Sequence, residues 1–335
     1  MVTFYKFIYQ AIGEFNSYSH ITNIIPISCF ILNFILLLVV KSDKLLYYEI
    51  IPIVVNLFVW IYYEYKNNWE LFDRDIDINL FLRIKKNISI GVIIMLGNFM
   101  GIWIANIDRW FVNFFCDIED FAFYSFAVTM LKLLNVIVTA FSITLYNYFC
   151  STYNLDNVIK MRKYVLIIAA ALLVIFFPLN FVILIYLPKY REAILIIKWL
   201  FASQFIMVEI NAVYMNLYKA LNQQRKYLIQ MMIVLLIAVL TNIFFGTISD
   251  YEIISFAGAT FFTSLIWLIL CQIGLQKYNL SINEWIYLIL VVVIYFFLGQ
   301  FNFLVGMFLY VILFILITFV FFRKEIRNSR KFFSH

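Results

Sequence analysis

Ten long apolar runs punctuate the sequence, and they restrict the chain to one kind of fold. A membrane-spanning helix needs about 20 mostly apolar residues. Runs close to that length lie at 21–40, 46–63, 88–107, 121–146, 164–187, 193–217, 227–246, 252–275, 282–299 and 302–322. The chain is 65% hydrophobic and 13% charged, which is more apolar surface than a water-soluble fold can bury. Because no run alternates like a membrane β-strand, the sequence predicts an all-α polytopic membrane protein with about ten transmembrane helices.

Charge and linker length predict three segments and one orientation. Residues 1–87 hold two spans and a charged cytoplasmic linker at 64–87, residues 88–275 hold a six-helix bundle, and residues 276–335 hold a helix pair and a basic cytoplasmic tail. With the N-terminus in the cytoplasm, eighteen of the 25 lysines and arginines fall inside and five fall outside. This positive-inside bias predicts that both termini are cytoplasmic. The basic residues therefore set the orientation in the membrane and do not indicate a nucleic acid partner.

The fourth predicted span carries one polar stripe. Its members are spaced by three or four residues and so share a helical face: Ser125, Thr129, Lys132, Asn135, Thr139, Ser142 and Tyr146. Polar side chains on such a face can also bond neighbouring helices. A lysine inside the hydrocarbon layer is costly and usually faces a cavity or a partner, so Lys132 favours a helix that lines a polar cavity. We expect Ser125, Lys132, Asn135, Thr139 and Tyr146 to line it.

Four more ionisable residues fall in or beside spans. Lys198 and Glu209 share a face of the sixth span but lie about 16 Å apart along its axis, so they cannot pair with each other. Lys198 is about one turn from the outer end, where snorkelling is the alternative to a cavity. Asp108 and Arg109 are predicted at the outer end of the third span. Lys198 and Arg109 are candidate cargo-binding cations, whereas Asp108 and Glu209 are candidate ion-coupling carboxylates.

Small residues mark another stripe on the third span. Gly97, Gly101 and Ala105 recur every four residues, a spacing that lets a neighbouring backbone or ring come close. We therefore expect this stripe to pack against another helix.

The sequence offers little for covalent chemistry. The two histidines, His20 and His335, lie outside the predicted spans, and the four cysteines are scattered without metal-ligand spacing: Cys29, Cys116, Cys150 and Cys271. No phosphate-binding glycine loop, zinc motif or nucleophile motif is present. We therefore expect no catalytic residues, no metal and no cofactor, and a transporter rather than an enzyme.

Several phrases resemble one family of membrane transporters. They are IANIDRWFV at 104–112, IEDFAFYSFAVTMLKLLNVIVTAFSITLYNYF at 118–149, YLPKYREAILIIKWLFASQFI at 186–206 and NLYKALNQQRKYL at 216–228. The most specific pieces are the Ile-Asp-Arg turn at 107–109, the Tyr-Ser-Phe-Ala run at 124–127 and the Leu-Tyr-Lys-Ala-Leu-Asn run at 217–222. Between about residues 88 and 250, their order resembles bacterial polysaccharide flippases of the Wzx type, in the multidrug/oligosaccharidyl-lipid/polysaccharide exporter superfamily.

This resemblance implies a MATE-like fold of two six-helix bundles around a central cavity, with two additional C-terminal helices. Here the third to eighth spans would be the second bundle, and the first two spans would end the first bundle. Four earlier helices would then be absent, which suggests an N-terminally shortened version. An upstream in-frame segment with four more apolar runs would support this idea, and a verified start at Met1 in an active protein would refute it.

The function implied is transport of an undecaprenyl-diphosphate-linked oligosaccharide across the bacterial cytoplasmic membrane for O-antigen, capsule or other surface polysaccharide synthesis. The cargo's diphosphate is anionic, so cationic side chains in a low-dielectric cavity would attract it. The cycle would be alternating access, coupled to a proton or sodium gradient. The expected partners are the lipid-linked oligosaccharide, membrane lipids and other polysaccharide assembly proteins.

Four other functions stay open. A polysaccharide polymerase of the same pathway needs a sizeable outer loop, whereas the predicted outer linkers reach about a dozen residues. A sugar acyltransferase should carry a histidine within a span. A multidrug exporter of the same superfamily would share the fold, but Lys132 favours an anionic cargo. A scaffold without transport would not need the polar stripe.

Overall fold

The computed structural model describes residues 2–41, 45–66, 80–151 and 155–332. Residues 67–79 of the predicted charged linker and residues 333–335 of the predicted basic tail lie outside the described residues. Every element assigned within the described ranges is helical, as the apolar runs predict. Nine of these helical segments are long and apolar enough to cross a membrane, and one more apolar helix, at Ile282–Leu298, is shorter. The chain is therefore described as a multi-pass membrane protein.

The chain divides into two compact units, Met1–Ile84 and Lys85–His335. The first contains α1 (Val2–Ile12), α2 (Phe15–Ile35) with a π-helical end η1 (Leu36–Val40), and α3 (Leu45–Lys66). Their shared core is small, and it includes Tyr5, Tyr9, Ile21 and Tyr63. The Tyr5 hydroxyl donates to Glu64, and Nδ1 of His20 lies 3.0 Å from the Tyr63 hydroxyl. These contacts tie α1 and α2 to α3.

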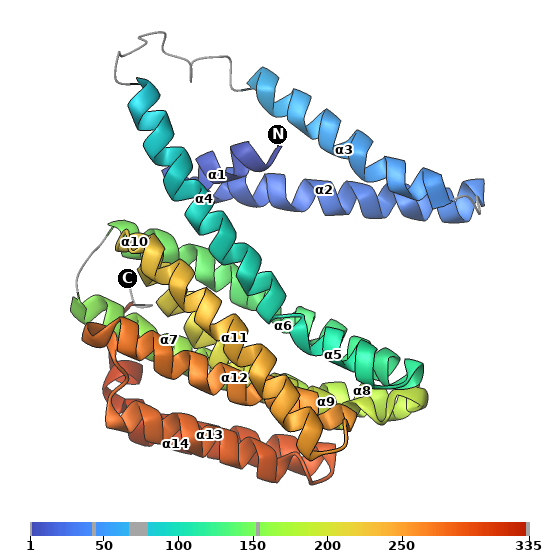
Figure 1. Cartoon of the computed structure of the whole chain (residues 1–335), viewed down its shortest axis with the longest axis vertical. Helices are drawn as coiled ribbons and strands as arrows, with labels where there is room; N and C mark the ends of the chain where they lie inside the picture. Colours follow the sequence, from blue (N-terminus) through green and yellow to red (C-terminus); the bar gives the residue numbers. More distant parts are fainter. Residues whose placement is uncertain (1, 42–44, 67–79, 152–154, 333–335) are drawn as a thin grey trace. The chain divides into compact units, whose positions relative to one another are not determined.

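The second unit holds the remaining helices (Figure 1). In chain order they are α4 (Leu80–Ile104, which begins before the boundary), α5 (Ile107–Phe115), α6 (Ile118–Ser151), α7 (Leu155–Leu172), η2 (Leu173–Ile175), α8 (Phe176–Tyr186), η3 (Pro188–Tyr190), α9 (Ala193–Glu209), η4 (Ile210–Tyr214), α10 (Met215–Ala220), α11 (Gln224–Ile248), α12 (Ile253–Gly274), η5 (Gln276–Tyr278), α13 (Ile282–Leu298) and α14 (Phe303–Phe332).

Helix α9 forms the centre of the second unit. It packs against α6, α7, α12 and α13, and among the candidate spans the segment Ala193–Ala220 is the most deeply buried. Helices α13 and α14 lie side by side (Figure 1). The Tyr310 hydroxyl of α14 donates to the carbonyl of Ala170 on α7 at 2.9 Å. The C-terminal pair is thus packed onto the helices around α9 within one compact unit.

Irregular turns interrupt three spans of the second unit well inside their ends, at Gly91–Phe115, Leu155–Tyr186 and Ala193–Ala220. Between α7 and α8 the helix tightens into the 3₁₀ segment η2, four residues before Pro178, whose missing N–H and bulky ring disturb the turn around Val174. After α9 the helix widens into the π-helical segment η4. Between α4 and α5 it breaks at Ala105–Asn106 and resumes at Ile107. Breaks of this kind are tolerated in a membrane where protein or water satisfies the freed backbone groups.

Candidate functional site

The break between α4 and α5 corrects one sequence prediction. Asp108 and Arg109 were expected at the outer end of the third span, but the candidate span runs on to Phe115. The helix resumes after the break, so both residues lie within the candidate span and not at its end. Asp108 occupies the first turn of α5, where the helix dipole favours a negative charge.

Asp108 is buried and fully engaged. Its side chain is 3% exposed. Oδ2 accepts hydrogen bonds from the hydroxyls of Tyr124 on α6 at 2.6 Å and Thr260 on α12 at 3.1 Å, and Oδ1 accepts one from the backbone N–H of Arg109 at 2.8 Å. Three donors suit an ionised carboxylate. Asp108 thereby ties the start of α5 to α6 and α12.

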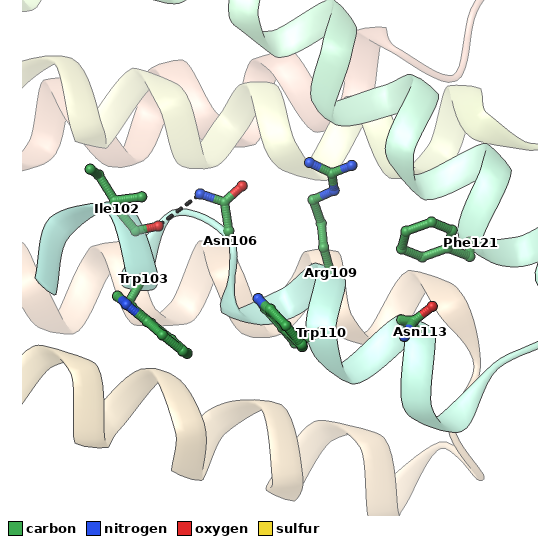
Figure 2. A pocket seen from close by; sticks show the side chains of 7 residues that line it. All are labelled: Ile102, Trp103, Asn106, Arg109, Trp110, Asn113 and Phe121. Carbon is green, nitrogen blue, oxygen red and sulfur yellow. Dashed lines mark hydrogen bonds between the residues drawn. The ribbon is translucent and has the colours of Figure 1, made fainter. Parts of the chain in front are cut away.

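Arg109 reaches into an open pocket of about 430 Å³ on the other side of α5. Figure 2 shows its lining, made of Ile102, Trp103, Asn106, Arg109, Trp110, Asn113 and Phe121. The guanidinium donates one hydrogen bond, to the Ser125 hydroxyl at 3.2 Å, while its buried Nε has no partner among the described residues. It also lies 6.0 Å from the centre of the Phe121 ring. The guanidinium therefore retains unused donors beside the pocket.

The same pocket has an aromatic wall. The indoles of Trp103 and Trp110 stack with centroids 6.2 Å apart and planes 10° apart. Asn106 and Asn113 add amide groups to the lining (Figure 2). Aromatic faces and amides are groups that can stack on and hydrogen-bond to sugars.

Lys132 is exposed and lines a second pocket, of about 190 Å³, formed by the α4–α5 break together with α6, α9, η4, α11 and α12. Eleven of its lining residues have polar side chains: Asn106, Asp108, Lys132, Asn135, Ser203, Gln204, Asn211, Asn242, Thr260, Thr263 and Ser264. Within the described residues, no ion pair involves Lys132. Asn106 lines both pockets. The break in the third span therefore lies between two adjacent pockets, and each pocket is lined by one cationic side chain.

The polar stripe of α6 is shared between this cavity and helix packing. Near the cavity, Gln204 of α9 donates to Asn135 at 2.5 Å. Further along, Ser142 donates to the carbonyl of Asn211 at 3.3 Å and accepts from Asn216 at 3.0 Å. Of the stripe, only Lys132 and Asn135 line the second pocket. Ser125 lines neither pocket and instead accepts a hydrogen bond from Arg109, whereas Ser142 bonds the π-helical segment and α10.

Thr139 and Tyr146, which were also predicted to line the cavity, lie on α6 away from both pockets. The Thr139 hydroxyl is exposed and bonds its own helix, at the carbonyl of Asn135. Tyr146 is half-buried. Neither residue lines either pocket.

Lys198 and Glu209 are not brought to these pockets. Lys198 is 7% exposed, and its ammonium lies 5.6 Å from the Phe296 ring on α13. A Cβ atom at Gly299 would collide with the same lysine side chain. Glu209 is fully buried and lies beside Arg162 of α7. The structure therefore separates these two candidates from Lys132, Arg109 and Asp108.

Arg162 and Glu284 were missed as interior residues. The charge count placed Arg162 in a cytoplasmic segment, but its side chain is 2% exposed and pairs with Glu284 of α13 at 2.6 Å. Part of this could be found in the sequence, because Ser281 and Glu284 have the spacing of a helix capping box, and the structure contains that box.

In comparisons with known proteins, no family model, curated protein or solved structure matches this chain.

Proposed function

We propose that the chain is a secondary transporter that moves an undecaprenyl-diphosphate-linked oligosaccharide across the bacterial cytoplasmic membrane for surface polysaccharide synthesis. The observation that carries the proposal is Lys132, an ammonium group on a candidate membrane span that lines a polar cavity without an ion-pair partner in the described residues. A cation kept in the membrane usually serves a pathway or a partner.

The arrangement suits an anionic, glycosylated cargo. Arg109 and Lys132 lie on the two sides of the α4–α5 break, and a diphosphate carries charge enough for both. The stacked indoles of Trp103 and Trp110 beside Arg109 suit a sugar ring. The lipid tail would remain in the bilayer while the head group crosses. Alternating access would move the cargo, with a proton or sodium gradient as the energy source.

The test is a set of variants in cells whose surface polysaccharide depends on this chain. We expect Lys132→Ala and Arg109→Ala to remove surface polysaccharide and to leave the lipid-linked repeat unit inside, with the protein still inserted. Lys132→Arg should retain part of the activity because it keeps the charge. Lys189→Ala removes an exposed lysine of η3 and should behave like wild type.

The outcomes separate the rival functions. Normal polysaccharide in Lys132→Ala and Arg109→Ala would contradict the proposed transport. A polymerase defect would still place single repeat units on the surface. A multidrug exporter would leave polysaccharide intact and would change only the resistance of the cells to cationic drugs.

A further inference from the structure

Three ionisable side chains meet where α7, α9 and α13 pack together. They are Arg162 of α7, Glu209 at the end of α9 and Glu284 in the first turn of α13, and none is more than 2% exposed. Burial removes their hydration, so each charge needs a partner inside the protein. Their hydrogen bonds show which of the three charges has a direct partner.

The guanidinium of Arg162 is bound to the α13 side. Its terminal nitrogens donate to the carbonyls of Tyr278 at 2.5 Å and Asn279 at 3.0 Å, and to Oε2 of Glu284 at 2.6 Å. The same Oε2 accepts from the backbone N–H and the hydroxyl of Ser281. Arg162 and Glu284 therefore form a direct, hydrogen-bonded ion pair, and only Nε of Arg162 and Oε1 of Glu284 remain without a hydrogen-bond partner in the described residues.

Glu209 has no such support. Both of its carboxylate oxygens are buried without a hydrogen-bond partner in the described residues, and Oε1 lies 3.9 Å from Nε of Arg162. The titratable groups that face it are Arg162 from α7, Glu284 from α13, Tyr214 from η4 and Cys271 from α12. One cation against two carboxylates leaves one negative charge unmatched. Asp108, in contrast, is equally hidden but receives three hydrogen bonds.

We propose that Glu209 is a proton-binding site, whose carboxyl group holds one proton while Arg162 is paired with Glu284. Release breaks the O–H bond of Glu209, sends the proton to water and leaves a carboxylate that draws Arg162 away from Glu284. A proton suits this place better than a metal ion, because the guanidinium would repel a cation and, in the described residues, no cluster of three or more acidic, histidine or cysteine side chains is placed to hold a metal.

The backbone beside Glu209 gives the proton a structural effect. The helix changes to the π-helical segment η4 at the next residue, Ile210. Such π-helical turns inside α-helices are frequent at functional sites. The occupancy of Glu209 would thus set how firmly α13 is held to α7 and α9. This inference does not depend on the proposed cargo.

Infrared spectroscopy of the purified full chain tests the proton directly. At neutral pH we expect a carboxylic acid C=O band that is lost in Glu209→Gln. The band should persist in Glu325→Gln, which removes a carboxylate paired with Lys163 at 2.7 Å. The same band in Glu209→Gln as in wild type, or no band in wild type, would overturn the proposal. A Na⁺-dependent rise in Tm that Glu209→Gln abolishes, in a protein without the band, would assign the site to a metal ion instead.

The pH dependence of thermal stability gives a second measurement. The folded protein would hold a proton that the unfolded chain releases near neutral pH, so Tm should fall as the pH rises. Glu209→Gln mimics the protonated side chain and should flatten this slope, whereas Glu325→Gln should keep it. An unchanged slope in Glu209→Gln overturns the proposal. If Glu209→Gln does not fold, the wild-type protein alone provides the test. Its carboxylic acid band and its Tm should then decline over the same pH range, and a decline over different ranges overturns the proposal.

Discussion

The hydroxyl of Tyr124 donates a 2.6 Å hydrogen bond to Oδ2 of Asp108, and both side chains are buried. This contact fixes the first turn of α5 against α6. It thereby determines where the chain resumes its helix after the break, and so where Arg109 and Asn106 are presented to the two pockets.

Tyr124→Phe should therefore destabilise the second unit. The change keeps the ring but removes a donor to a buried carboxylate, which costs about 1.5–3 kcal/mol. A Tm measurement in detergent checks it. Tyr186→Phe is the matched control, because Tyr186 is 72% exposed at the end of α8. Equal Tm values for the two variants would show that the hydrogen bond from Tyr124 to Asp108 does not contribute to stability.

Cysteine labelling should separate the wet and the lipid-facing sides of α6. In a chain with the four native cysteines replaced, we expect Lys132→Cys to react with a membrane-impermeant charged thiol reagent, because the site opens into a polar cavity. Val136→Cys should not react, although Val136 is 72% exposed, since it lines neither pocket. Equal reaction at both positions would argue against a hydrated cavity beside Lys132.

Two glycines on α4 should respond differently to alanine. A Cβ atom at Gly97 would run into the ring of Tyr227, which is held by its hydrogen bond to Asn98 at 2.8 Å, whereas at Gly101 no atom lies within 4 Å. Gly97→Ala should lower stability by about 1–3 kcal/mol through overpacking. Gly101→Ala should raise it by about 0.5–1 kcal/mol, because alanine favours a helix. Thermal unfolding of the pair measures both effects, and the reverse order would refute the packing of α4 on α11.

Cys116 should react slowly with thiol reagents. It lies between two candidate spans, and burial, reinforced by Asp120 and Asp117, raises the pKa of its thiol to about 11. The thiolate is the reactive form, so labelling should speed up roughly tenfold per pH unit until that pKa is reached. In a chain with Cys116 as the single cysteine, Asp120→Asn should increase the rate at pH 8. A rate that is flat between pH 8 and pH 10 would contradict this pKa.

The spans could be read from the sequence because length and hydropathy are local properties. All ten predicted runs coincide with helices, although α13 is shorter than the usual span. The end of the third run could not be read in the same way. Asn106, Asp108 and Arg109 look like a polar span end, yet Asp108 is satisfied by Tyr124 and Thr260 from two other helices. In the local sequence, a polar residue inside a span looks the same as one at the end of a span. The two cases differ only in hydrogen-bond partners that are distant in the sequence.

The site was predictable in part for the same reason. Helical spacing placed Lys132 and Asn135 on one face, and both line the second cavity. Spacing could not reveal Gln204 as the partner of Asn135, which is 69 residues away, or Glu284 as the partner of Arg162, which is 122 residues away. A count of the basic residues on each side of the membrane assumes that each of them is solvated. It therefore cannot detect an arginine that forms a buried ion pair inside the protein. The cytoplasmic placement of both termini stays a prediction.

The anchoring of Arg162 ties the interior of the second unit to the segment that runs from Tyr278 into the first turn of α13. Its guanidinium donates to Tyr278, Asn279 and Glu284. A chain cut ahead of Tyr278 would therefore leave this cation without all three of these acceptors, with only Glu209 beside it. Trimming beyond Phe322 would remove Glu325, the ion-pair partner of Lys163, but none of the oxygens that hold Arg162. The start of α13 thus neutralises a charge on α7, and the core around α9 depends on residues that follow it in the chain.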